Sequence, residues 1–197
     1  MAEPISLADM RIYLRLAVTQ IDEDALISSM ITAARRACEF RLNRSVLGET
    51  RTAVFSGFPS YPYYLDGRVP VRQQLFLALP GGTVSSVTSI TYYDSANTVQ
   101  TLDPLTYGIN AGRLPAVLAP VSVWPASYDR SDALTVTYVI SPLSVDDQAV
   151  VVMAIKLLVG HWFENRTSVA ADMRGTPVEM PMSVSWMLQP MRVIPFR

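Results

Sequence analysis

The sequence has few charged residues. Only 17% of its 197 residues are charged, against roughly a quarter in an average soluble protein, while half are hydrophobic. The longest apolar run, 149–160, is too short to cross a bilayer, and Lys156 interrupts it. A chain that is short of charge and has no candidate membrane segment is expected to bury part of its surface against a partner or against copies of itself.

Cysteine and histidine each occur once. Cys38 cannot form an internal disulfide or hold zinc alone, so a small buried hydrophobic role on a helix is favoured. His161 would have to serve any Ser/His/Asp or Cys/His site, but it lies near the end of a predicted packed helix. Its one acidic neighbour at helical spacing is Glu164, which is a weak basis for a metal site. We therefore expect no catalytic residue, no metal and no cofactor.

The common sequence signatures of active sites are also missing. There is no GxGxxG, no GxxxxGK[ST] and no HExxH motif. The N-terminus has neither the basic start nor the apolar core of a signal peptide, so we expect the protein to be made in the cytoplasm. The net charge of −1 argues against strong binding of nucleic acid by the chain as a whole. Of the 16 basic residues only one is lysine, and arginine suits bidentate contacts at interfaces, although genomic base composition explains the bias equally well.

Capping residues and apolar spacing predict four helices. Ser6 and Ser144 precede acidic residues at the positions expected for helix starts, and 22–24 are three acids that favour another start. Leu26, Met30, Ala33, Ala37 and Phe40 recur at three- and four-residue steps and predict a long helix that ends near Asn43. The last helix is predicted over 182–188, before Pro190.

The middle of the chain changes to strand patterns. Residues 134–140 form the clearest strand signal, Asp94–Asn97 is typical of a hairpin tip, and Gly81-Gly82 of a turn. The sequence therefore predicts an α+β fold with a small antiparallel β module inserted into a helical bundle. In this division the helical core comprises 1–48 and 142–166, the β module 49–141, and a linker with an extended C-terminal docking arm 167–197.

Three groups of residues are candidates for contacts with partners or ligands. The first is basic and could face DNA or a neighbouring subunit, although a solvated helix face is the commoner meaning of this spacing; it comprises Arg35, Arg36, Arg41 and Arg44. The second is the apolar end of the chain, which follows a loose linker and is expected to dock on a partner unless it folds back on its own subunit. Its members are Trp186, Leu188, Arg192, Ile194 and Phe196.

A third group, Tyr61, Tyr63 and Tyr64, could stack on a sugar or base, but packing of a proline-rich loop accounts for it as well.

The order of several short motifs resembles the long-form gp6-like head–tail connector (adaptor) proteins of tailed bacteriophages and gene transfer agents. The resemblance extends over nearly the whole chain. It rests on 6–15, 22–27, 87–94, Trp124-Pro125, 136–139, Gln148-Ala149, the sequence His-Trp-Phe-Glu-Asn-Arg at 161–166, Pro181-x-Ser183-Val184 and Leu188-x-Pro190-x-Arg192. The chain departs from the common pattern after Arg166, where Thr167-Ser168 stands in place of an acid.

The resemblance implies a non-catalytic virion protein at the head–tail junction, assembled in the host cytoplasm. Such a subunit forms a ring of about a dozen copies under the portal protein and extends the DNA channel toward the tail. Its partners would be its own copies, the portal, a stopper or tail-completion protein, and genomic DNA passing without sequence specificity, but no membrane. The alternatives are a stopper or tail-completion protein, or a small glycan- or receptor-binding tail module.

Overall fold

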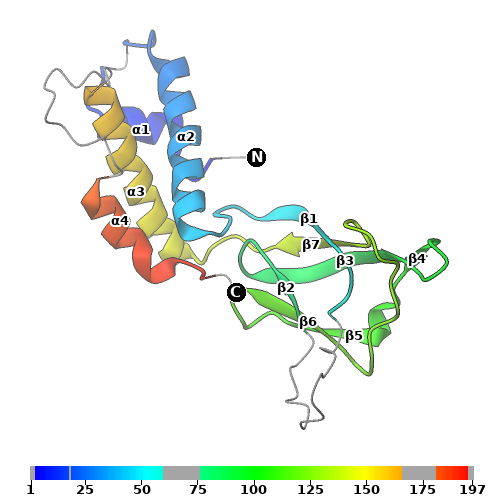
Figure 1. Cartoon of the computed structure of the whole chain (residues 1–197). Coiled ribbons are helices and arrows are strands. Elements are labelled where there is room, and N and C mark those ends of the chain that lie inside the picture. The colour runs from blue at the N-terminus through cyan, green and yellow to red at the C-terminus, as the bar shows by residue number, and fades with distance from the viewer. Residues whose placement is uncertain (1–2, 18, 60–75, 166–180, 195–197) are drawn as a thin grey trace, which may run out of the picture. The chain divides into compact units, whose positions relative to one another are not determined.

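The structure, a computed structural model, describes residues 3–17, 19–59, 76–165 and 181–194. The chain divides into two compact units. The helical unit comprises Met1–Leu47 and Leu143–Arg192, and the β unit comprises Gly48–Pro142 and Val193–Arg197. The fold is α+β, as the sequence predicts, and along the chain most of the β unit comes between the two segments of the helical unit. Figure 1 shows the helices and strands of each unit.

Four α-helices form the helical unit: α1 (Leu7–Tyr13), α2 (Asp24–Leu42), α3 (Val145–Glu164) and α4 (Met182–Leu188). Ser6 and Ser144 cap α1 and α3 as predicted, because their hydroxyl oxygens accept from the backbone N–H of Asp9 and Asp147. The long helix α2 lies against α3, and α4 packs on α3 (Figure 1). A 3-10 turn, η2 (Gln189–Met191), follows α4.

One arginine fixes the connection between α1 and α2. The Arg11 guanidinium donates to both carboxylate oxygens of Asp24, at 3.0 and 2.9 Å. It also donates to the carbonyls of Ala17 and Gln20, at 2.8 and 2.9 Å. The first residue of α2 is thus held from within α1.

One row of residues on α2 is buried in the core of the helical unit. The buried residues of this helix are Ile27, Ile31, Ala34, Cys38 and Leu42. They meet the buried face of α3, whose members are Val151, Ala154, Ile155, Leu158 and Val159. The apolar row whose spacing predicts the helix lies beside this face, since Phe40 is 91% exposed and Leu26 is 39% exposed. Cys38 is buried, in agreement with its predicted role.

Two antiparallel sheets form the β unit. The four-stranded sheet has the order β1 (Glu49–Phe55), β7 (Leu134–Ile140), β3 (Val84–Tyr93) and β4 (Val99–Thr101). The three-stranded sheet has the order β2 (Leu77–Leu79), β6 (Ala116–Pro120) and β5 (Tyr107–Asn110), with a 3-10 turn, η1 (Pro104–Thr106), before β5. Strand β7 pairs with both β1 and β3, and alternate residues along it are buried.

The predicted turns of the β unit are confirmed. Asp94 accepts from the backbone N–H of Ala96 and of Thr98, both at 2.9 Å, and Asn97 has a φ of 59° at the hairpin tip. Gly81 has a φ of 108°, and a Cβ there would lie 2.6 Å from Cδ1 of Ile140, so this turn requires glycine. Among the described residues, no helix is long and apolar enough to cross a membrane.

Candidate assembly surfaces

Helix α4 places its apolar side chains on two sides. Val184 and Leu188, four residues apart, are fully buried in the core of the helical unit. Met182 and Trp186 have the same spacing and lie 76% and 73% exposed. Because residues four apart share a face of a helix, one row of α4 anchors it to its own subunit while the other row presents a methionine and a tryptophan to solvent.

The structure separates the residues predicted for the docking arm. Leu188 belongs to the core, so the described part of the arm folds back at this point and the Leu188 side chain is not available to a partner in this conformation. Trp186, Arg192 and Ile194 are exposed, and Ile194 groups with the β unit rather than with the helices. Phe196 lies outside the described residues, as does most of the predicted linker, 167–180.

Two members of the predicted basic group, Arg35 and Arg36, form ion pairs within the chain. Arg35 donates from Nε to Glu3 at 2.7 Å and from one terminal nitrogen to both carboxylate oxygens of Glu39 at 3.0 Å. Its side chain is only 11% exposed, and hydrogen bonding to Glu3 is the main reason that the pKa of Arg35 is raised above its ordinary value. Arg35 therefore stabilises the fold, and its guanidinium is not directed at a partner.

The other three arginines differ in accessibility. Arg36 is 68% exposed and makes one contact of 3.2 Å to Glu39. The Nε atoms of Arg41 and Arg44 are buried and have no hydrogen-bond partner among the residues that the structure describes. Burial lowers the pKa of Arg44, partly offset by the charge of Asp147. Arg36 is thus the member of this group that is best placed to meet a phosphate or a neighbouring carboxylate.

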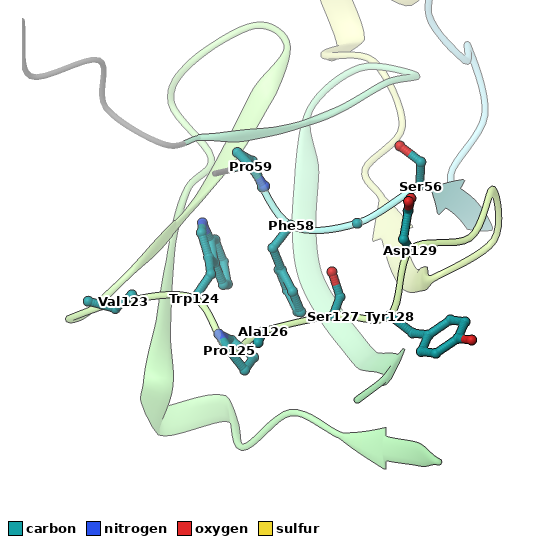
Figure 2. Close-up of a pocket in the computed structure, with 11 residues that line it drawn as sticks. Ser56, Phe58, Pro59, Val123, Trp124, Pro125, Ala126, Ser127, Tyr128 and Asp129 are labelled. Atoms are coloured by element: carbon teal, nitrogen blue, oxygen red, sulfur yellow. The ribbon is translucent and has the colours of Figure 1, made fainter. Parts of the chain in front are cut away.

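A hollow of about 590 Å³ opens beside the predicted Trp124-Pro125 pair in the β unit. Figure 2 shows Phe58 and Trp124 face to face at its wall, and their ring centroids are 4.9 Å apart with an interplanar angle of 16°. Phe58 also packs edge-on against Tyr92, at 5.3 Å. Since Trp124 is only 7% exposed and Phe58 covers one face of it, the cluster is a packed core element rather than an open stacking platform for a sugar.

Few ionisable groups line this hollow. Among the described residues that line it, Asp129 is the one carboxylate, and Ser56, Ser127 and Tyr128 contribute hydroxyl groups. Tyr61, Tyr63 and Tyr64 lie outside the described residues.

The single histidine lies at the end of α3. Its Nδ1 is 3.4 Å from the side-chain nitrogen of Asn165, which donates at 2.9 Å to the His161 carbonyl and so helps to end the helix. His161 and Glu164 line a groove of about 750 Å³ together with Tyr13, Arg15 and Ser183. Within the described ranges, no three His, Cys, Asp or Glu residues are placed to hold a metal ion.

Comparison with known proteins gives a match in structure and none in sequence. No family model matches the chain, and no curated protein matches it. The structure is similar to a chain in the neck of an empty gene transfer agent particle computed with C6 symmetry, with a TM-score of 0.69 and 17% identity, over 100% of this chain and 95% of the other.

Two further solved structures give the same result. A chain of the virion of a native gene transfer agent particle matches with a TM-score of 0.68 and 18% identity, over 98% of this chain and 92% of the other. A chain in the neck of the native particle computed with C12 symmetry matches with a TM-score of 0.67 and 16% identity, over 100% and 94%.

The chain has the fold of these neck proteins. The matches extend over both the helical unit and the β unit, and they leave no substantial part of either chain outside the alignment. They confirm the resemblance in fold that the order of the sequence motifs indicates.

Proposed function

We propose that this protein is a structural subunit of the neck of a tailed phage or gene transfer agent particle. In this role it is a head–tail connector that forms a ring under the portal and extends the DNA channel toward the tail. The observation that carries the proposal is the match of the complete fold to proteins from gene transfer agent particles, two of them solved as necks with C6 or C12 symmetry. The proposed location is the head–tail junction of the virion, after assembly in the host cytoplasm.

The outward face of α4 is the proposed contact with the portal. Trp186 and Met182 combine large apolar area with exposure, and tryptophan is among the residues that most often dominate the energy of an interface. Arg192 adds an exposed positive charge just after η2. Ile194 and Phe196 complete the proposed docking residues, whereas Leu188 acts by holding α4 on the core.

Contact with DNA in this proposal is electrostatic and independent of sequence. Arg36 is the exposed arginine of the predicted basic group, and Arg35 is paired with Glu3 and Glu39. Because the net charge is −1, DNA passing through the ring would meet no strongly attractive surface from the chain as a whole.

The test is reconstitution with a purified portal protein from the same genome, followed by electron microscopy. The full-length chain is expected to form a ring on the portal, and a protein that ignores the portal would contradict the connector role. Trp186→Ser is expected to weaken attachment by about thirtyfold or more if the side chain is a central contact. Val54→Ser, at a side chain 55% exposed on β1, is the matched control and is expected to attach normally.

Point substitution is the sharper test of the docking residues. Deleting 181–197 would also remove Val184 and Leu188 from the core, so a loss of attachment could come from unfolding of the helical unit. Normal attachment by Trp186→Ser would show that the portal contact lies elsewhere, without affecting the proposed ring.

A further inference from the structure

An exposed apolar row runs along α2. It comprises five residues spaced by four, three, four and three positions, which we call the α2 stripe: Leu26, Met30, Ala33, Ala37 and Phe40. Phe40 is 91% exposed and Leu26 39% exposed, and Ala33 is also exposed. Met30 and Ala37 are partly buried against the core, so the stripe lies at the boundary between the packed interior and solvent.

The other flank of α2 is already covered by the chain itself. Glu3 accepts from the Thr32 hydroxyl at 3.0 Å and pairs with Arg35 at 2.7 Å, and Ile5 is buried in the same core. On each side of its buried face, α2 has one further row of residues. The N-terminal segment contacts the polar row, which contains Thr32 and Arg35. The apolar flank therefore carries exposed side chains that would ordinarily be buried, and Arg36, four residues before Phe40, is an exposed charge at its edge.

The spacing of the stripe suits another helix. Apolar residues at alternating steps of four and three form the seam along which two helices pack at a shallow angle. From 26 to 40 the stripe is about 21 Å long, at about 1.5 Å per residue, which is about three quarters of the length of α2. An isolated exposed residue would need no explanation, but a row of this length and regularity indicates a partner surface.

We propose that the partner is a second copy of this chain, and that the α2 stripe is the centre of the contact between neighbouring subunits of the ring. The inference rests on the proposed function. Matched structures come from necks with C6 and C12 symmetry, and each subunit of a cyclic ring needs two different faces for its two neighbours. The stripe supplies one such face on the helical unit, and Phe40 is its most exposed anchor.

The first experiment measures self-association of the full-length chain by sedimentation velocity, from about 1 µM to about 1 mM. The wild-type mass is expected to rise with concentration, and Phe40→Asp is expected to weaken association by about thirtyfold or more. Leu105→Asp is the matched control, because Leu105 is 83% exposed in the β unit and lies outside the stripe. A wild-type chain that stays monomeric, or a Phe40→Asp variant that associates like the wild type, would overturn the inference.

The second experiment places a photo-crosslinking phenylalanine analogue at position 40 and maps its products by mass spectrometry. Cross-links to a peptide of another copy, distinguished by isotope labelling, would support the proposal. Cross-links confined to the same copy would show that a segment of the chain itself covers the stripe, and would overturn it.

The inference and the proposed function can fail separately. If Phe40→Asp still forms rings on the portal, the stripe is not the subunit contact but the connector role stands. If the wild-type chain associates through Phe40 yet forms no ring on the portal, the contact between copies stands and the connector role fails.

Discussion

Helices α2 and α4 each carry two apolar rows, one buried and one exposed. In α4 the exposed row consists of Met182 and Trp186 on a helix of seven residues. In α2 it is the five-residue stripe on a helix of 19 residues. A short row with one large ring can insert an anchor into a pocket, whereas a long row with regular spacing can align with a whole helix. The two proposals assign these rows differently, the α4 row to the portal and the α2 stripe to a second copy of the chain.

The largest expected effect is on the reactivity of Cys38, which lies in the buried row of α2. Desolvation raises the pKa of Cys38 to about 12, with a smaller contribution from the charge of Glu39. Against an ordinary value of 9.0, the reactive thiolate is much scarcer in the folded protein, so thiol labelling is expected to be slower than in the denatured chain by on the order of a thousandfold. The measurement is the rate of reaction with a chromogenic disulfide at mildly alkaline pH, with and without denaturant.

The same shift gives a pH dependence of stability. Because the Cys38 thiol binds its proton more tightly in the folded protein, its contribution to the free energy of unfolding is complete below pH 9.0. That contribution is lost as the pH rises toward about 12. Labelling that is equally fast in folded and denatured protein would mean that the Cys38 row is accessible, and the assignment of the two rows of α2 would have to be exchanged.

A second prediction compares the two rows of α4. Leu188→Ala removes a fully buried side chain and is expected to lower the free energy of unfolding by about 2–5 kcal/mol through lost burial and a cavity. Trp186→Ala, at a position 73% exposed, is expected to change it by no more than about 0.5 kcal/mol. Urea denaturation followed by far-UV circular dichroism measures both. Equal destabilisation by the two substitutions would show that Trp186 also packs on its own subunit.

The smallest expected effect concerns adjacent arginines on α2. Arg35→Ala leaves Glu3 and Glu39 without their shared partner and is expected to cost about 1–2 kcal/mol of stability. Arg36→Ala removes one exposed contact and is expected to cost less than about 0.5 kcal/mol. The comparison uses the same denaturation assay at low and moderate salt. A larger loss for Arg36 than for Arg35 would contradict the structural role given to Arg35.

Local signals in the sequence predicted much of the architecture. Ser6 and Ser144 cap helices as their positions indicate, Asn43 ends α2 with a φ of 53°, and 134–140 is a strand with alternate residues buried. These features depend on interactions within a few residues, so the sequence contains the information directly. The order of motifs over the whole chain also predicted the fold that the structural comparison confirms.

The candidate site was less accessible from sequence. The C-terminal segment was expected to dock on a partner, and nothing in its composition separates Leu188, which is buried, from Trp186, which is exposed. Likewise, the spacing of the basic group does not reveal that Glu3, 32 residues before Arg35 in the sequence, pairs with it. Both outcomes depend on contacts between segments that are distant along the chain.

The sequence by itself determined that α2 is a helix with apolar residues on one side, because period and capping are local properties. Only the tertiary structure decided which of its two adjacent apolar rows is buried. The rows begin at Leu26 and Ile27, one residue and about 100° apart around the helix axis, and they are similarly hydrophobic. Packing of α3 and of the N-terminal segment buries the Ile27 row and leaves Leu26, Ala33 and Phe40 of the α2 stripe exposed.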